Sequence, residues 1–219
     1  MIRQTLKKTA MTRLGRSPKH GSFDRAQINE IIDATPLCHL GQQTNGQTVV
    51  IPTCHWRIDN HIYWHGSKIS RSIIDATAHK VCLTVTHLDG LVLARSGFHH
   101  SANYRSVMIF GTPEVVDAPE QKLSALQAFI EGLFPGRWAI LRAPSRKEMN
   151  ATTVLRIPID EASAKIRSGP PIDHAGDETL PIWAGVVPIT QQVGEPVPCA
   201  NNQAKLKTPK HVTNYRIGE

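Results

Sequence analysis

Aromatic residues make up only 5% of this 219-residue chain, so its core must be built mainly from aliphatic side chains. Long apolar runs are also missing, and none approaches the roughly 20 residues that a membrane-spanning helix needs. The four cysteines form no Cys-x-x-Cys pair, and the basic N-terminal segment has no apolar stretch typical of a secretory signal. We therefore expect a cytoplasmic protein with free cysteines, without a membrane span.

Familiar catalytic motifs are absent as well. The chain contains no Gly-x-x-x-x-Gly-Lys loop for a nucleoside triphosphate and no Gly-x-Ser-x-Gly nucleophile elbow, which argues against a P-loop enzyme and a serine hydrolase. Its 11 histidines include the neighbours His99 and His100, which would point to opposite faces of a strand. We interpret the histidines as hydrogen-bonded or half-exposed, and expect no metal site.

A formal net charge of +7 favours anionic partners, but much of the excess lies near the two ends of the chain. Solvated arms explain it better than a nucleic-acid interface, so nucleic acid is an unlikely partner. Composition divides the chain into a basic N-terminal arm (residues 1–22), a globular domain (23–167) and a Pro-rich C-terminal arm (168–219). The last arm also carries apolar residues, which predicts that it packs on the body or on a partner subunit.

Short β-rich runs alternate with a few helical patterns. Asp24 is a good N-cap for a helix that Pro36 ends, and Asp89-Gly90 is a typical hairpin turn. Some six strands at tight spacing predict a mainly β fold with peripheral helices, an antiparallel barrel. The strands are expected at residues 37–41, 48–58, 62–64, 81–86 with its return 91–94, 107–116 and 152–159, and further helices at 70–76, 117–133 and 161–166.

The turn after Trp64 is the strongest local clue to a ligand. His65-Gly66-Ser67 ends an apolar strand, and Lys68, Ser70 and Arg71 then stand at the start of a short helix. Helix N-termini carry unpaired N–H groups and the positive end of the helix dipole, and hydroxyl and cationic side chains add hydrogen-bond donors. This combination suits a phosphate, although an ordinary capped turn with solvated cations explains the run about as well. Because the triphosphate loop is absent, we expect a phosphate-bearing cofactor.

Several longer motifs resemble a known family. The densest is residues 86–107, Thr-His-Leu-Asp-Gly-Leu-Val-Leu-Ala-Arg-Ser-Gly-Phe-His-His-Ser-Ala-Asn-Tyr-Arg-Ser-Val. Others are Val-Ile-Pro-Thr at 50–53, His-Gly-Ser-x-x-Ser-Arg at 65–71, Pro-Gly-Arg-Trp at 135–138, Ser-Ala-Lys-x-Arg-x-Gly-Pro-Pro at 163–171 and Trp-Ala-Gly-Val-Val-Pro at 183–188. Over residues 13–190 the sequence resembles the pyridoxamine 5′-phosphate oxidase-like superfamily, in its flavin-nucleotide-binding, nitroimidazole-resistance-type branch.

This resemblance implies a split β-barrel that forms a homodimer and binds FMN in a groove between the subunits. It also implies a set of cofactor contacts. Residues on one strand would line the flavin ring, the turn would run past the ribityl chain, the helix start would hold the phosphate, and residues of the arm would reach across from the other subunit. The predicted contacts are Ile51, Pro52, Thr53, His65, Gly66, Ser67, Lys68, Ser70, Arg71, Arg105, Ser106, Arg167 and Trp183. Pro52 within a strand independently indicates an edge or bulge, where backbone groups stay free for a ligand.

The family resemblance suggests an FMN-dependent oxidoreductase acting on a small molecule, with electrons from a nicotinamide or another donor. His65 is the one candidate catalytic residue, as a proton donor near the cofactor. Two alternatives remain open, a non-catalytic flavin-binding or storage module and a haem-associated protein on the same barrel, the latter motivated by the histidines and by haem-handling relatives. Arg95, Arg105 and Arg142 are either ligand clamps or partners in salt bridges.

Overall fold

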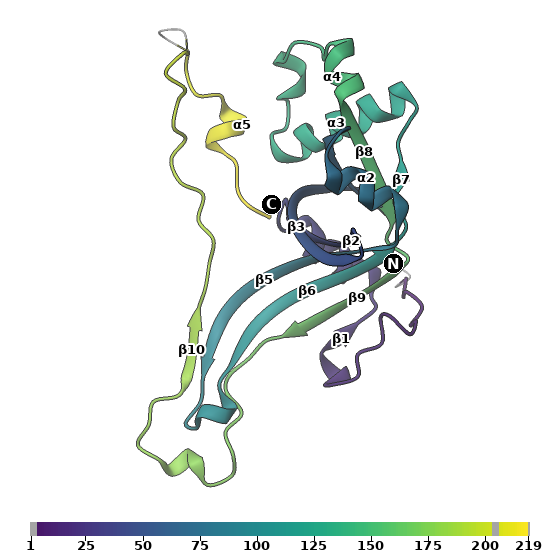
Figure 1. Ribbon diagram of the computed structural model, residues 1–219. Helices are drawn as coiled ribbons and strands as arrows, with labels where there is room; N and C mark the ends of the chain where they lie inside the picture. The colour runs from purple at the N-terminus through teal and green to yellow at the C-terminus, as the bar shows by residue number, and fades with distance from the viewer. Residues whose placement is uncertain (1–3, 203–205, 219) are drawn as a thin grey trace.

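In the computed structural model, which describes residues 4–202 and 206–218, the protein is mainly antiparallel β-sheet with a few helices, as the sequence predicts. The strands follow the order β1-β9-β6-β5-β2-β3-β4-β8-β7, with β10 added beside β5 (Figure 1). Their bounds are β1 Gly21–Ser22, β2 Leu37–Thr44, β3 Gln47–Ile58, β4 His61–Ser67, β5 Val81–Leu93, β6 Ser101–Gly111, β7 Glu114–Val115, β8 Thr152–Pro158, β9 Glu161–Arg167 and β10 Gly185–Pro188. The helices are α1 Arg25–Asp33, α2 Arg71–Ala78, α3 Pro119–Leu133, α4 Arg146–Ala151 and α5 Lys210–Thr213.

Aliphatic side chains from the strands and from α1 form the main core, as the low aromatic content requires. The largest fully buried members include Leu40 on β2, Leu83 on β5 and Ile109 on β6, which share one row across the sheet. Helix α1 adds Ile28 and Ile32, both fully buried, in the same cluster. Because these α1 residues pack in one cluster with the strand residues, side chains fill the interior of the barrel over the described part of the chain.

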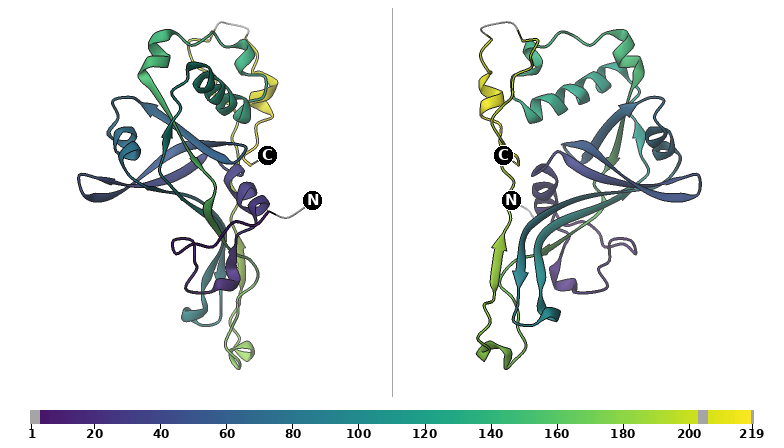
Figure 2. Two further views of the ribbon diagram at one scale, coloured as in Figure 1. Left: turned by 90° about the vertical axis from the view of Figure 1, so that its right-hand side faces the viewer. Right: turned by 60° about the vertical axis from the view of Figure 1, so that its left-hand side comes forward.

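A second, smaller core joins α3 to β3, β4 and β8. Trp56 packs against Phe129 with ring centroids 4.8 Å apart, and Tyr63, Ala125 and Val154 complete the cluster. The residues from α3 to α4 therefore form a cap over this part of the sheet (Figure 2). The sequence predicts α3 well, because its apolar stripe and its early proline are typical of a helix start and a buried face.

Strands β5 and β6 form a long hairpin that projects from the barrel (Figure 1). The Asp89-Gly90 turn predicted within it is wrong, because β5 runs on to Leu93 and only changes register between Leu88 and Gly90. Glycine is needed at position 90 for a different reason. A Cβ there would lie 3.0 Å from both Val186 Cγ1 and the Val187 carbonyl oxygen, so β10 could not approach β5.

Residues 161–166 form a strand and not the predicted helix. Strand β9 pairs along its whole length with β6, from Tyr104 opposite Arg167 to Phe110 opposite Glu161. Alanine, glutamate and lysine favour helices in isolation, but burial of Ala162 and Ala164 in the main core outweighs that preference. The predicted strand 107–116 also starts earlier, as β6, and is interrupted before β7.

Both arms contact the body at some of their described residues. At the N-terminal side Leu6 is buried in the main core, and Thr9 Oγ1 donates a 2.6 Å hydrogen bond to Glu161. At the C-terminal side, β10 pairs with β5, the following residues 190–202 are mostly exposed, and the chain returns through α5 to end near β3 (Figure 1). All four cysteines are free, and burial raises the pKa of the Cys38 thiol to about 12. No described helix has the length and apolar character needed to span a membrane.

Two histidines hold the C-terminal end of α1 on the sheet. Nε2 of His55 lies 3.1 Å from the Ile32 carbonyl oxygen, and Nε2 of His87 lies 2.9 Å from the Ile31 carbonyl oxygen. Because a carbonyl oxygen only accepts, each Nε2 carries the proton. His55 is only 3% exposed, and burial lowers its pKa from 6.5 to about 4.

We expect His55 to make the fold sensitive to mild acid. Above pH 6.5 the imidazole is neutral in both the folded and the unfolded chain. Between pH 6.5 and 4 the unfolded chain binds a proton that the folded chain does not. The free energy of unfolding therefore falls by up to about 3 kcal/mol as pH decreases through this range. Urea unfolding at pH 7 and pH 5 should show this loss. His55→Gln, which keeps a donor for the Ile32 carbonyl, should lose less, whereas His79→Gln on the surface should behave like the parent. An unchanged pH dependence in His55→Gln would contradict the assignment.

Candidate functional site

Strands β3 and β4 separate halfway along, and this opens the edge of β3. The two strands pair from Ile58 opposite His61 to His55 opposite Trp64. Beyond that point β4 keeps only its pairing with β8 on its other edge, which runs from His61 opposite Pro158 to Ser67 opposite Thr152, while residues 47–54 of β3 pair only with β2. Ile51, Pro52 and Thr53 therefore lie on a stretch of β3 that has a strand neighbour on one side only. The prediction from Pro52 of a strand edge is confirmed.

The turn after β4 continues directly into α2. The Lys68 N–H donates to the Ala151 carbonyl at 2.8 Å, and the Ser70 N–H donates to the Ser67 carbonyl at 2.9 Å. Ser70 is the N-cap residue of α2, but its hydroxyl lies 2.8 Å from the Ser72 hydroxyl and does not cap the helix backbone. The N–H groups of Arg71 and Ser72 have no partner in the described part of the chain. The first turn of α2 thus presents backbone donors and two hydroxyls.

Gly66 permits this turn to lie close to α2. A Cβ at position 66 would stand 2.8 Å from Ile73 Cγ1 and 2.9 Å from Ile73 Cδ1, closer than real side-chain contacts allow. Ile73 is buried in the main core, so it has little room to move. The absence of a side chain at Gly66 therefore sets the separation between the end of β4 and the first turn of α2.

Two cationic side chains stand at this helix start, and a third interacts electrostatically with one of them, Lys68. Lys68 and Arg71 are exposed, and among the described residues neither is paired with a carboxylate. The third is Lys122 of α3, whose Nζ donates a 2.6 Å hydrogen bond to the Met149 carbonyl. Burial lowers the pKa of Lys122, the nearby carboxylate of Asp117 opposes this, and the positive charge of Lys68 lowers it further. We call Lys68, Ser70, Arg71, Ser72 and Lys122 the cation cradle.

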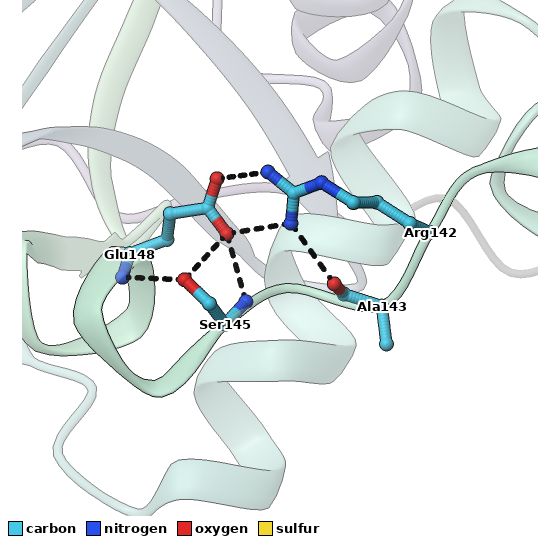
Figure 3. Close-up of polar contacts among 4 residues, drawn as sticks. All are labelled: Arg142, Ala143, Ser145 and Glu148. Carbon is cyan, nitrogen blue, oxygen red and sulfur yellow. Dashed lines mark hydrogen bonds and ion pairs between the residues drawn. The ribbon is translucent and has the colours of Figure 1, made fainter.

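Helix α4 positions two members of the cradle through its carbonyl groups, and a separate polar network fixes α4 itself (Figure 3). The Glu148 carboxylate accepts hydrogen bonds from the backbone N–H of Ser145 at 2.7 Å and from the Arg142 guanidinium at 2.5 and 2.8 Å. In return, Ser145 Oγ accepts a hydrogen bond from the Glu148 N–H at 3.2 Å. This capping box lowers the pKa of the Glu148 carboxyl well below its usual range, first through the hydrogen bonds from Arg142 and Ser145. Arg142 is therefore a helix-cap partner and not a free ligand clamp.

His65 lies between the cradle and the second core. Its ring centroid is 5.7 Å from that of Trp56 and 5.5 Å from that of Phe129, and its Nδ1 is buried without a hydrogen-bond partner in the described chain. Burial lowers the pKa of His65 below 6.5, so the ring is mostly neutral at pH 7. A neutral imidazole at the edge of an open strand can exchange a proton with a ligand bound there.

The other four predicted contacts lie elsewhere in the same chain. Arg105 binds Asp89 through two hydrogen bonds of 3.0 and 2.9 Å, and Ser106 Oγ donates to the Lys165 carbonyl at 3.2 Å. Strands β5 and β2 separate these two residues from β3. Arg167 donates to Asn103 Oδ1 at 2.5 Å, and Trp183 is 67% exposed beside β10. Within one chain the structure brings nine of the thirteen predicted residues to the opening between β3 and β4, and leaves these four outside it.

Sequence analysis missed Lys122, because only the apolar positions of α3 had a recognisable pattern. Its one visible signal is a lysine in the first turn of a helix, where acidic residues are usually favoured. Its neighbour in the cradle, Ser72, has the hydroxyl partner Ser70 two residues earlier. The completed site has an open strand edge at one end and a cluster of positive charge and hydrogen-bond donors at the other. That arrangement fits a planar, partly polar ring joined to a phosphate.

Comparison with known proteins places the chain in a family. The family model described as pyridoxamine 5′-phosphate oxidase matches residues 24–166, which include the opening between β3 and β4 and the whole cradle. No curated protein matches the sequence.

Solved structures agree over nearly the full length. The flavocytochrome Anf3 from Azotobacter vinelandii is 40% identical, with a TM-score of 0.93 and coverage of 95% of this chain and 98% of that one. A FAD and haem binding protein from Mycobacterium smegmatis is 35% identical, with a TM-score of 0.86 and coverage of 90% and 97%. The fold is shared by a Bacteroides thetaiotaomicron protein described as a 5-nitroimidazole antibiotic resistance protein. It is 21% identical, with a TM-score of 0.55 and coverage of 65% of this chain and 84% of that one. The chain belongs to the pyridoxamine 5′-phosphate oxidase family of split-barrel proteins.

Proposed function

We propose that this protein binds a flavin nucleotide at the opening between β3 and β4 and uses it in electron transfer. The observation that carries the proposal is the cation cradle beside an open strand edge. Lys68, Arg71 and Lys122 supply three positive charges, and the first turn of α2 supplies N–H donors, which together suit a phosphate dianion. When bound, the flavin supplies the electron chemistry, while the protein binds, orients and tunes it.

The unpaired edge of β3 gives the flavin ring its polar partners. Neighbouring residues of a strand present their backbone groups to opposite edges. Because the His55 N–H bonds the Pro36 carbonyl on the β2 side, Ile51 and Thr53 also face β2. The open edge presents the backbone groups of Val50, Pro52 and Cys54, of which Pro52 has no N–H. An isoalloxazine ring has both donors and acceptors along its pyrimidine edge, so a free strand edge complements it. FMN is the form predicted from the sequence. FAD is the second candidate, because the Mycobacterium smegmatis relative is a FAD and haem binding protein.

We also propose that a second subunit packs beside the site. Exposed apolar side chains lie on the outer faces of the central strands, with Leu37 48%, Val50 64% and Met108 42% exposed. A second copy of the chain would cover this face, and in such a homodimer the exposed Trp183 and the Arg167 side chain could contribute to the partner's cofactor site. Arg105 and Ser106 have partners in their own chain and would serve the site indirectly.

Haem binding is a second candidate function, because two structures at 40% and 35% identity are named as a flavocytochrome and as a FAD and haem binding protein. Two histidines near the tip of the β5–β6 hairpin could act as axial haem ligands. Nδ1 of His100 lies 2.9 Å from the Ser96 carbonyl oxygen and Nδ1 of His174 lies 2.9 Å from the Ala175 carbonyl oxygen. Each Nδ1 therefore carries the proton and leaves an Nε2 lone pair, the usual state of an axial haem ligand.

The absorbance spectrum of the untreated, purified protein tests the proposal. We expect flavin bands, and chromatography of the cofactor released by acid should identify FMN or FAD; a Soret band would add haem. Light scattering should give about twice the 24.2 kDa chain mass.

Bleaching of the flavin bands by NADH or NADPH, and their recovery with an added acceptor such as a nitroaromatic, would distinguish an oxidoreductase from a storage module. A colourless protein that fails to take up either flavin would contradict the proposal.

Neutralising the cradle should weaken cofactor binding without unfolding the protein. Arg71→Gln and Lys122→Gln should each raise the flavin dissociation constant about 10-fold or more, since a hydrogen bond to a charged group contributes about 1.5–3 kcal/mol. Fluorescence quenching of the flavin measures this. Lys147→Gln, which removes an exposed charge from α4 outside the cradle, is the matched control and should change affinity less than about 2-fold. Equal flavin affinities in all three variants would show that the phosphate does not bind at this site.

We also propose that His65 donates a proton to the reduced substrate. Because burial lowers its pKa, the protonated fraction, and with it this contribution, should increase as pH falls below 6.5. His65→Gln should lower acceptor turnover about 100-fold at pH 6 and flatten the dependence of rate on pH, with flavin still bound. Full turnover in His65→Gln at pH 6 would show that the residue has no such role.

A further inference from the structure

A separate pocket lies on the other side of the aromatic cluster, under the C-terminal segment of residues 206–218, which we call the strap. The pocket has a volume of about 310 Å³ and lies between the end of α1, β3, α3 and the strap. This size is at the lower end of typical small-molecule sites. None of the residues of the cation cradle lines it, so it is distinct from the proposed flavin site.

The strap closes the pocket through a small number of contacts. The Tyr215 ring packs on Phe134 with centroids 5.0 Å apart, and His211 of α5 meets the edge of the same ring at 6.4 Å. Gly218, with φ of +80°, lies against the end of α1, where a Cβ would be 2.9 Å from the Ala34 carbonyl oxygen. A second pocket of about 370 Å³ also lies between the strap and the end of α3. The strap is therefore loosely packed there and could lift to admit a ligand.

The walls of the pocket are aromatic, and its one unbalanced charge is positive. Trp56, Phe129 and Tyr215 contribute ring surfaces. Of the charged residues that line it, Asp33 and Arg57 pair with each other, at 2.9 Å from Arg57 Nε to Asp33 Oδ1. Arg216 is the remaining cation, and no carboxylate among the described residues pairs with it.

Two buried polar atoms of lining residues have no partner in the described chain, Nδ1 of His55 and Nε1 of Trp56. Both residues are more than nine-tenths buried, at 3% and 8% exposure. Because Nε2 of His55 already carries the ring proton, its Nδ1 can only accept a hydrogen bond. Buried unpaired groups are rare in folded proteins and frequently mark a place that water or a ligand completes.

From these observations we propose that the pocket binds a small aromatic carboxylate that also carries a hydroxyl or N–H group. The ring would stack on the aromatic walls and the carboxylate would pair with Arg216. The donor would bond Nδ1 of His55 when movement of the side chains that cover this atom exposes it to the pocket. Strap opening would control entry. The site requires neither flavin nor haem, so it is independent of the function proposed above.

Gly132 offers a way to fill the pocket without disturbing the core. It lies in α3 and lines the pocket, and a Cβ there would meet no atom within 4 Å. Gly132→Leu therefore places a side chain in empty space and replaces a poor helix former with a good one. Gly132→Ala makes the same helical gain with a single methyl group, so it is the matched control. Both variants should melt at or above the temperature of the parent.

Calorimetric titration of the full-length chain with 4-hydroxybenzoate tests the proposal. We expect saturable binding with one site per chain, affinity lowered at least about 10-fold by Gly132→Leu, and less than about 2-fold change in Gly132→Ala. Arg216→Gln should weaken 4-hydroxybenzoate about 10-fold but leave the uncharged 4-hydroxybenzamide unaffected. Tyr215→Ala on the strap should weaken binding, whereas Val197→Ala, an exposed position outside the strap, should not. Absence of saturable binding, or equal affinity in Gly132→Leu and Gly132→Ala, would overturn it.

Discussion

The separation of β4 from β3 beyond the His55–Trp64 pair is the constraint on which the candidate site depends. Beyond that pair no strand lies on this side of β3, because β4 diverges from it while staying paired with β8 on its other edge, and unpaired backbone groups at a strand edge need a partner. The same divergence leads the end of β4 into the turn that starts α2. Gly66 permits that turn to approach Ile73. A single topological feature thus creates both the polar edge for a ring and the helix start for a phosphate.

The cap formed by α3 and α4 supports this arrangement from outside the barrel. Carbonyl groups at the C-terminal half of α4 fix the Lys68 backbone and the Lys122 side chain, and the Glu148 capping box fixes the start of α4 (Figure 3). Two lysines that would repel each other are held near one helix start. Retaining like charges close together lowers stability, and sites that do so commonly bind an anion. The cap therefore belongs to the site as much as to the fold.

Local signals in the sequence were sufficient for α1, α3 and the turn around Gly66, because caps, prolines and apolar periodicity are properties of neighbouring residues. They failed where the deciding contact is distant. Asp89-Gly90 has the composition of a hairpin turn, yet Arg105 on β6 and the approach of β10 determine its structure. Residues 161–166 have helical propensity, yet pairing with β6 makes them a strand. Lys122 joins the cradle only through tertiary packing, so no local pattern could identify it.

The most direct test compares riboflavin with riboflavin 5′-phosphate, because the two ligands differ only in the group assigned to the cation cradle. Fluorescence titration of the cofactor-free protein should give a dissociation constant at least about 100-fold lower for the phosphorylated form, as expected for two or more charge-assisted hydrogen bonds. In a variant carrying both Arg71→Gln and Lys122→Gln, most of that difference should disappear. Equal affinity of the parent protein for the two ligands would contradict the account.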